Sequence, residues 1–174
     1  MSNKIRDIKF FTQDAETLAK ALLGKVLCHR TFDKNNEPFI IRGRIMETEA
    51  YRACDAATDA NRTKTKNSQY LSGGHLYFHK GRERIDIVAN QENIPESVLI
   101  RAIDSYGSHP SYVVWAMDFT SKDDGKDLLE KDDGTDCIWL EDDGCEIELN
   151  EPAKRVEIED EAKLNFSIKA LSFN

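Results

Sequence analysis

The order of the predicted elements limits the fold more than any other feature of this sequence. Segments with strand character follow one another without the regular strand–helix–strand alternation of parallel α/β proteins. We predict strands at residues 25–32, 39–51, 75–80, 84–90, 97–104, 137–140, 145–149, 155–158 and 166–173. We therefore expect an α+β fold: a single domain over residues 1–174 with a curved antiparallel sheet, flanking helices and a protruding β-hairpin.

Two helices are expected beside this sheet. Apolar residues recur at helical spacing between residues 13 and 23, with Thr12 as the expected N-cap and Gly24 as the residue that ends the helix. Residues 52–72 lack periodicity, so we predict a loop there. A second helix is predicted to begin at Pro110 and to bury Tyr112, Trp115, Ala116 and Phe119.

The charge of the chain is distributed unevenly. Its 174 residues carry a net charge of −8, which by itself argues against a nucleic-acid partner. Residues 1–101, however, hold 17 Lys and Arg against 13 Asp and Glu, whereas residues 102–174 hold 7 against 19. The first part of the chain therefore has the basic excess that DNA binding requires.

The sequence also limits the expected location. The four cysteines include no CxxC pair, so they are interpreted as reduced thiols and not as disulfides or zinc ligands. No apolar run approaches the ~18 residues that span a membrane, and no export signal is visible. We expect a protein of the bacterial cytoplasm (nucleoid) or the nucleus that is not secreted and does not contact a membrane.

The long strand at residues 39–51 holds the most informative side chains. With a period of two, Glu47, Glu49 and Tyr51 share a face with Ile45. A carboxylate in such apolar surroundings suits a general base, although the end of the strand could also emerge into solvent. Arg101 lies among aliphatic residues and needs a carboxylate partner if its face of the strand is the buried one.

The predicted hairpin combines aromatic and cationic residues. Tyr77, Phe78 and His79 precede the turn KGRER at residues 80–84. This combination is typical of nucleic-acid contacts and equally of a solvated turn. The candidate DNA-binding cations are Arg62, Lys64, Lys66, Lys80, Arg82 and Arg84.

Two segments resemble the alkyladenine (3-methyladenine) DNA glycosylases. Residues 14–27, DAETLAKALLGKVL, resemble the opening of that family, and residues 42–51, RGRIMETEAY, are similar to its catalytic strand. The similarity is good over residues 9–104 and thin afterwards. It implies a monofunctional glycosylase that flips an alkylated purine of the 3-methyladenine type out of the duplex and hydrolyses its N-glycosidic bond.

The resemblance also implies roles for individual residues. Glu49 matches the general base that activates the attacking water, Arg101 the arginine beside it, and the carbonyl near Val156 is implied to hold the water. Tyr51 matches a wall of the base pocket, and Asn90 matches the residue that discourages normal guanine. No metal or other cofactor is implied, and the implied partner is double-stranded DNA containing damaged purines, bound by a monomer.

The sequence departs from the family pattern in the base pocket. Asp59 stands where the family has a histidine, and His79 replaces a tyrosine of the opposite wall. The turn at residues 80–84 offers no tyrosine to fill the gap left by the flipped nucleotide. These departures leave open a catalytically impaired protein of the same fold that binds damaged DNA. A divalent-metal hydrolase that uses Glu47 and Glu49 is a further alternative.

Overall fold

The computed structural model describes residues 3–104 and 106–173, in which helices and strands alternate irregularly. The helices are α1 (Ile8–Phe11), α2 (Ala15–Leu22), α3 (Asp59–Thr63) and α4 (Pro110–Ala116), with the 3₁₀ helices η1 (Ser68–Tyr70) and η2 (Ser121–Asp123). The strands are β1 (Asn3–Lys4), β2 (Val26–Phe32), β3 (Pro38–Tyr51), β4 (Leu76–Phe78), β5 (Ile85–Val88), β6 (Ser97–Ile103), β7 (Cys137–Asp142), β8 (Glu146–Leu149) and β9 (Asn165–Ser172).

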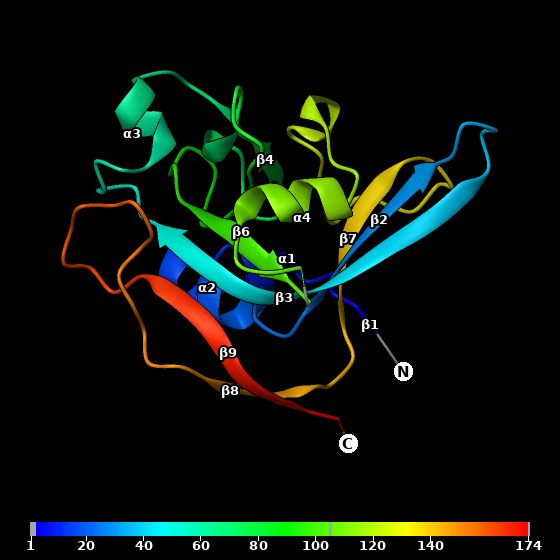
Figure 1. Cartoon of the computed structure of the whole chain (residues 1–174). Helices are drawn as coiled ribbons and strands as arrows, with labels where there is room; N and C mark the ends of the chain where they lie inside the picture. Colours follow the sequence, from blue (N-terminus) through cyan, green and yellow to red (C-terminus); the bar gives the residue numbers. More distant parts are fainter. Residues whose placement is uncertain (1–2, 105, 174) are drawn as a thin grey trace.

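The strands form one curled sheet in which all pairs are antiparallel. Its order is β1-β7-β2-β3-β6-β5-β4, and β9 joins β8 to β3. The long strand β3 is the centre of this arrangement, because its first half pairs with β2 and its second half pairs with both β6 and β9. Figure 1 shows α4 in front of β6 and α2 behind β3. The predicted α+β class with an antiparallel sheet is confirmed.

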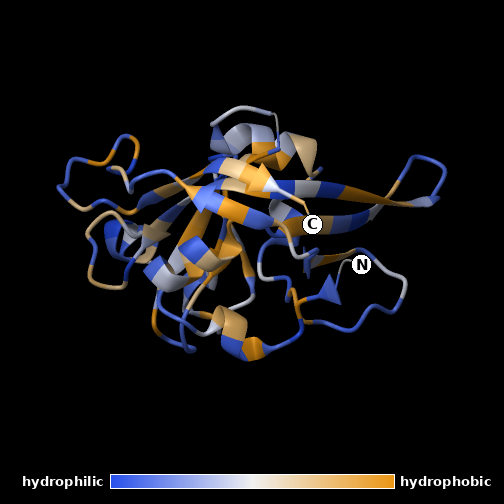
Figure 2. Cartoon of the chain, turned by 90° about the horizontal axis from the view of Figure 1, so that it is seen from below, coloured by the Kyte–Doolittle hydropathy of each residue, from blue (hydrophilic) through white to orange (hydrophobic). Residues whose placement is uncertain are grey.

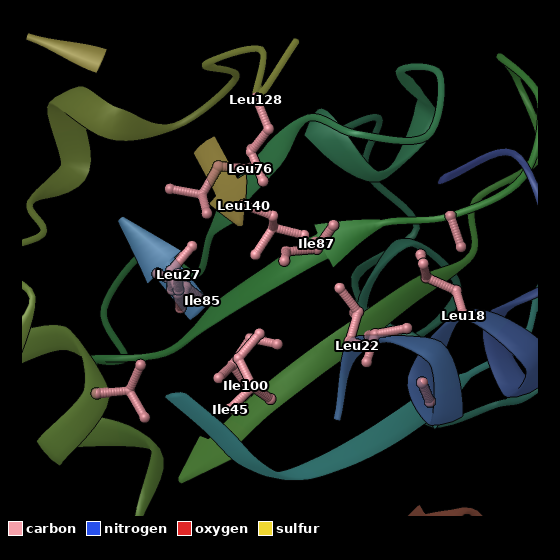
Figure 3. Packing of buried hydrophobic residues seen from close by; sticks show 14 of the residues in the cluster. Leu18, Leu22, Leu27, Ile45, Leu76, Ile85, Ile87, Ile100, Leu128 and Leu140 are labelled. Carbon is pink, nitrogen blue, oxygen red and sulfur yellow. The ribbon is translucent and has the colours of Figure 1, made fainter. Parts of the chain in front are cut away.

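The hydrophobic core joins the helices to the sheet. Figure 3 shows aliphatic side chains of α2 and of the strands β2, β3, β5, β6 and β7 gathered in one region. Leu18 and Leu22 of α2 have no exposed surface. Complete burial of a leucine side chain contributes roughly 1.5–3 kcal/mol, so α2 is held mainly by its apolar face.

The structure corrects the predicted ends and faces of the helices. The N-cap of α2 is Asp14, whose carboxylate accepts a hydrogen bond from the Thr17 N–H, and not Thr12, which ends α1. In α4, Tyr112 and Trp115 are exposed, although Phe119 beyond the helix is buried as predicted. The buried face of α4 consists of Pro110, Val113 and Val114. Because nearly every residue of α4 is apolar, its periodicity does not identify the buried side.

Two further predictions about local structure are wrong. Residues 52–72 contain α3 and η1, which are too short to produce a periodic pattern. Residues 155–158 form a tight turn and not a strand. Glu157 adopts a left-handed φ of 61°, and the Ile158 N–H donates to the Arg155 carbonyl. The left-handed conformation ends the extended backbone that the apolar residues had suggested.

Figure 2 shows hydrophobic positions along the central strands and hydrophilic ones in the turn that projects from β2 and β3. Among the described residues, no helix combines the length and the apolar character needed to cross a bilayer.

Candidate active site

The second half of β3 and the facing strand β6 bring two carboxylates against one arginine. Arg101 Nε lies 3.2 Å from Glu47 Oε1 and 3.5 Å from Glu49 Oε1. Register shifts on both sides of Glu47 make the pairing of β3 with β6 irregular at this point, and such irregularities re-aim side chains. The predicted ion pair of Arg101 is confirmed, and both candidate carboxylates take part in it.

Both faces of this part of the sheet are covered. Glu49 has no exposed surface, which excludes the interpretation that the end of β3 emerges into solvent. Thr48, on the opposite face, donates its hydroxyl hydrogen to the Ala19 carbonyl of α2 at 2.9 Å. Every residue of β6 is buried, so Arg101 lies within the protein whichever face it occupies.

Donors from three parts of the chain surround the Glu49 carboxylate. Its Oε1 accepts hydrogen bonds from the Val156 N–H at 2.8 Å and from Asn165 Nδ2 at 3.1 Å. Its Oε2 accepts one from the Tyr51 hydroxyl at 3.0 Å. These donors and Arg101 replace the hydration that a buried carboxylate loses. Because Oε2 has a single partner among the described residues, it retains a lone pair that can accept a hydrogen bond from water.

Tyr51 is held in the protonated form that this arrangement requires. Burial, together with the negative charge of Glu49, raises the pKa of the Tyr51 phenol above its usual range. The phenol therefore donates to the carboxylate at neutral pH.

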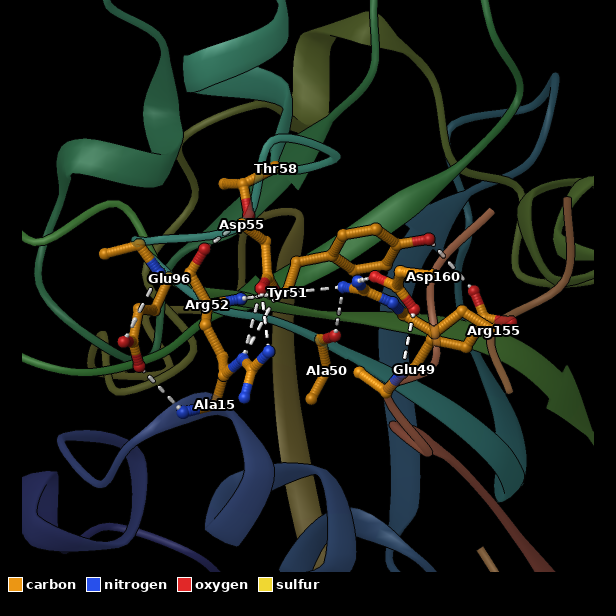
Figure 4. Close-up of polar contacts among 12 residues, drawn as sticks. Ala15, Glu49, Ala50, Tyr51, Arg52, Asp55, Thr58, Glu96, Arg155 and Asp160 are labelled. Atoms are coloured by element: carbon orange, nitrogen blue, oxygen red, sulfur yellow. Dashed lines mark hydrogen bonds and ion pairs between the residues drawn. The ribbon is translucent and has the colours of Figure 1, made fainter. Parts of the chain in front are cut away.

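A buried arginine fastens the segment that carries Val156. Arg155 Nη1 donates to the Ala50 carbonyl at 3.0 Å and to Asp55 Oδ2 at 2.9 Å, and Nη2 contacts Asp160. Its guanidinium group also lies 4.8 Å from the centre of the Tyr51 ring. Figure 4 shows these residues as one polar cluster. Arg155 thus ties the turn at residues 155–158 to Tyr51 and Asp55, and the Val156 N–H ties the same turn to the Glu49 carboxylate.

An open pocket lies beside Tyr51. Its volume is about 90 Å³, and its lining contains Tyr51, Asp59, His79, Asp86 and Leu99. His79 Nε2 lies 2.7 Å from Asp86 Oδ1. Asp59 contacts the Tyr77 hydroxyl and the Arg62 guanidinium group. Burial opposes ionisation of Asp59, but these hydrogen bonds outweigh it and lower the pKa of this carboxyl group.

Of the predicted catalytic and base-pocket residues, Tyr51, Asp59 and His79 line this pocket. Glu49 and Arg101 lie outside the lining, and Glu49 adjoins it through the Tyr51 hydroxyl. Asn90 does not belong to the lining. Its side chain instead accepts a hydrogen bond from the Gln91 N–H, and Asp86 is the residue of the same region that reaches the pocket. Val156 also lies outside the lining but touches Glu49 through its N–H. The role of its carbonyl in holding a water stays a prediction.

The predicted DNA-binding cations lie around the mouth of the pocket. Arg62, Arg82 and Arg84 line it, and Lys66 and Lys80 line a neighbouring depression that shares Asp59 and Arg62 with it. Lys64, the C-cap of α3, is exposed and lines neither of them. Three of the six cations therefore line the pocket, and two more line the depression next to it.

The arrangement of cations bears on the metal-hydrolase alternative. The Arg101 guanidinium group lies between Glu47 and Glu49, where a shared metal ion would have to bind. Elsewhere, His29, Asp123 and Asp136 have ligand atoms within 4.8 Å of one another. Lys126 Nζ contacts both of these carboxylates, so an ammonium group already compensates for their charge. Neither arrangement favours a metal site.

Three residues of the site were missed by sequence reasoning. Asn165 and Arg155 lie in the acidic last third of the chain, more than 100 residues from β3. Only a predicted contact between β9 and β3 would have placed them. Asp86 had a local signal, because it is a carboxylate in the apolar run at residues 85–88.

Comparisons with known proteins agree with this geometry. The sequence profile of the family described as Methylpurine-DNA glycosylase (MPG) matches residues 9–109, which include β3, β6 and every residue of the pocket lining except Ile158. A relative from Chlamydia pneumoniae, provisionally named a 3-methyladenine DNA glycosylase, is 37% identical over 101 residues, covering 54% of this chain and 49% of the relative.

Two other relatives carry the same provisional name. One from Clostridium acetobutylicum is 39% identical over 103 residues, covering 55% of this chain and 48% of its own. One from Borreliella afzelii is 39% identical over 106 residues, covering 56% of this chain and 54% of the relative. The match thus spans about half the length of these relatives. Since the family profile covers more than half of this chain and includes the site residues of β3 and β6, the chain belongs to the methylpurine-DNA glycosylase family.

Proposed function

We propose that this protein is a monofunctional DNA glycosylase that hydrolyses the N-glycosidic bond of alkylated purines of the 3-methyladenine type. The observation that carries this proposal is the fully buried Glu49 carboxylate, with Arg101, Asn165, the Val156 N–H and Tyr51 as its partners. Of these partners, Tyr51 also lines an open pocket. A carboxylate fixed in this way suits the deprotonation of a water molecule.

In this mechanism Glu49 acts as the general base. A water bound to the free lone pair of Oε2 gives its proton to Glu49 as its oxygen attacks C1′ of the damaged nucleotide. The bond from C1′ to the purine nitrogen breaks, and its electron pair leaves with the base. A purine that already carries a positive charge accepts this pair more readily than a neutral one. Arg101 touches Glu49 and compensates for its charge before the reaction.

The pocket beside Tyr51 is suited to an extruded base. Chemistry at C1′ within a stacked duplex is blocked, so the nucleotide has to leave the helix first. Tyr51 and Leu99 offer surfaces against which a purine ring can pack, and the cations at the mouth suit the flanking phosphates. We propose that the protein acts as a monomer on double-stranded DNA, in the compartment that holds the DNA.

A test of this function uses duplex DNA alkylated with dimethyl sulfate. With protein in excess, we expect wild type to release 3-methyladenine and 7-methylguanine and to leave abasic sites, with equal rates in EDTA and in Mg²⁺. Loss of release in EDTA and its recovery with Mg²⁺ would support the metal hydrolase. Tight binding of the alkylated duplex without release of any base would support the impaired, damage-binding protein.

A further inference from the structure

The pocket beside Tyr51 has an acidic floor and a basic rim. Asp86 is almost completely buried, and the Asp59 side chain is 12% exposed. His79 lies between them, with Nε2 2.7 Å from Asp86 and Nδ1 3.8 Å from Asp59. The guanidinium groups at the opening belong to Arg62, Arg82 and Arg84. A ligand therefore passes positive groups at the mouth and meets carboxylates inside.

The floor is held rigidly before any ligand binds. The Asp86 carboxylate accepts hydrogen bonds from the Ser97 hydroxyl at 2.6 Å and from His79. The His79 ring also packs against the Tyr77 ring with 4.4 Å between their centres. Preorganised polar groups of this kind discriminate strongly between ligands, because a mismatched ligand leaves them unpaired.

Two groups of the floor, His79 Nδ1 and the Asp59 carboxylate, are suited to contact an incoming base. His79 Nδ1 is buried and has no hydrogen-bond partner among the described residues. Asp59 is an anion at neutral pH, because the hydrogen bonds from Tyr77 and Arg62 lower its pKa despite its burial. A carboxylate anion only accepts hydrogen bonds. A base edge of lone pairs would offer it no further donor and would be repelled by its charge.

We propose that the acidic floor, with Asp59 as its specificity-determining residue, selects purines that are cationic or present N–H donors. This inference rests on the proposed glycosylase function. 7-Methylguanine carries a positive charge and donates from N1 and from its 2-amino group. 1,N⁶-Ethenoadenine is a neutral lesion of larger ring area without an N–H donor on the corresponding edge. The floor should favour the first lesion and disfavour the second.

The test measures how Asp59→Asn changes the preference between these two lesions. Single-turnover release is measured on matched duplexes containing one 7-methylguanine or one 1,N⁶-ethenoadenine. The ratio of the two rates in the variant is divided by the ratio in wild type, which cancels the different intrinsic lability of the bonds. We expect the rate of 7-methylguanine release, relative to that of ethenoadenine release, to be roughly ten- to a hundredfold smaller in the variant than in wild type, as for the loss of a hydrogen bond to a charged group.

Arg62→Ala is the matched control, because it removes the ion-pair partner of Asp59 and leaves the carboxylate in place. It should weaken binding to both duplexes alike and keep the wild-type ratio. An equal change of the ratio in Arg62→Ala and Asp59→Asn would overturn the proposal, because the effect would then belong to the ion pair. Thermal unfolding checks that each variant is folded, and Asp59→Ser replaces Asp59→Asn if the latter is not.

The outcomes separate this inference from the proposed function. If wild type releases the lesions and the ratio of the two release rates is the same in Asp59→Asn, the inference is overturned and the proposed glycosylase function stands. Release of neither would overturn the proposed function. Competition binding of the same two duplexes then measures the preference without chemistry: a smaller preference for 7-methylguanine in Asp59→Asn supports the acidic floor, and an unchanged one refutes it.

Discussion

Replacing Arg155 by methionine tests how the C-terminal third of the chain holds the site. The Arg155 guanidinium group is buried, pairs with Asp55 and Asp160, and donates to the Ala50 carbonyl. Methionine keeps an apolar chain of similar length against the Tyr51 ring but removes the charge and all three contacts. The variant therefore removes the polar link between the turn at residues 155–158 and β3.

The expected loss of stability is worked out from these contacts. Removing one partner of a buried ion pair costs about 3–5 kcal/mol, because the other charge stays buried. Asp55 keeps hydrogen bonds from the Arg52 backbone and side chain, and Asp160 is 35% exposed, so both are partly compensated. We therefore expect Arg155→Met to lower the free energy of unfolding by about 3 kcal/mol, at the low end of this range.

The assay is equilibrium unfolding in urea, with Lys154→Met as the matched control. Lys154 is the neighbouring residue, and its ion pair with Glu161 is largely exposed, so its loss should cost less than about 1 kcal/mol. Asp55→Asn should recover part of the stability when it is added to Arg155→Met, because it removes the uncompensated charge. Equal stability of Arg155→Met and Lys154→Met would refute the reasoning.

Three further predictions concern the site and the thiols. Asn165 donates to both site carboxylates, so Asn165→Ala should lower the free energy of unfolding in urea by about 1–3 kcal/mol, and wild-type stability of this variant would contradict its role. Burial opposes ionisation of Asp55, but hydrogen bonds from Arg52 lower its pKa, so its contribution to stability is present above about pH 4 and is lost as the pH falls through its pKa in the folded protein. The stability difference between wild type and Asp55→Asn should therefore shrink on acidification, and a difference that grows would be inconsistent with this sign. Burial raises the pKa of the Cys28 thiol to about 12, so a thiol reagent at pH 8 should label the exposed Cys54 in the native protein and spare Cys28, as peptide mapping can check.

The sequence predicts most of the strands and the first half of the site because their signals are local. The alternation in β3 places Glu47 and Glu49 on one face, and the aliphatic neighbours of Arg101 indicate a buried charge that needs a partner. Both features depend on residues within a few positions of each other. The sequence leaves the ion pair conditional on the buried face of residues 97–104, and the pairing of β3 with β6 is what brings Arg101 to the carboxylates.

The rest of the site depends on contacts that no local pattern encodes. Asn165 reaches Glu49 because β9 pairs with β3, and Arg155 reaches Asp55 across 100 residues of chain. The buried face of α4 was also misjudged, because the large aromatic side chains of Tyr112 and Trp115 were expected to be buried, whereas the valines are the residues that pack against the core. Periodicity identifies a helix but does not rank its faces when all of them are apolar.

The most direct test of the central claim compares base release by wild type, Glu49→Gln and Glu47→Gln. All three proteins are assayed under single-turnover conditions on duplex DNA that contains one 7-methylguanine. The account predicts a loss of roughly 10²–10⁴-fold for Glu49→Gln, as expected for a lost general base, with DNA binding retained. Glu47→Gln should lose far less, because Glu47 acts through its contact with Arg101. Wild-type release by Glu49→Gln, or a larger loss in Glu47→Gln, would contradict the assignment of Glu49 as the base.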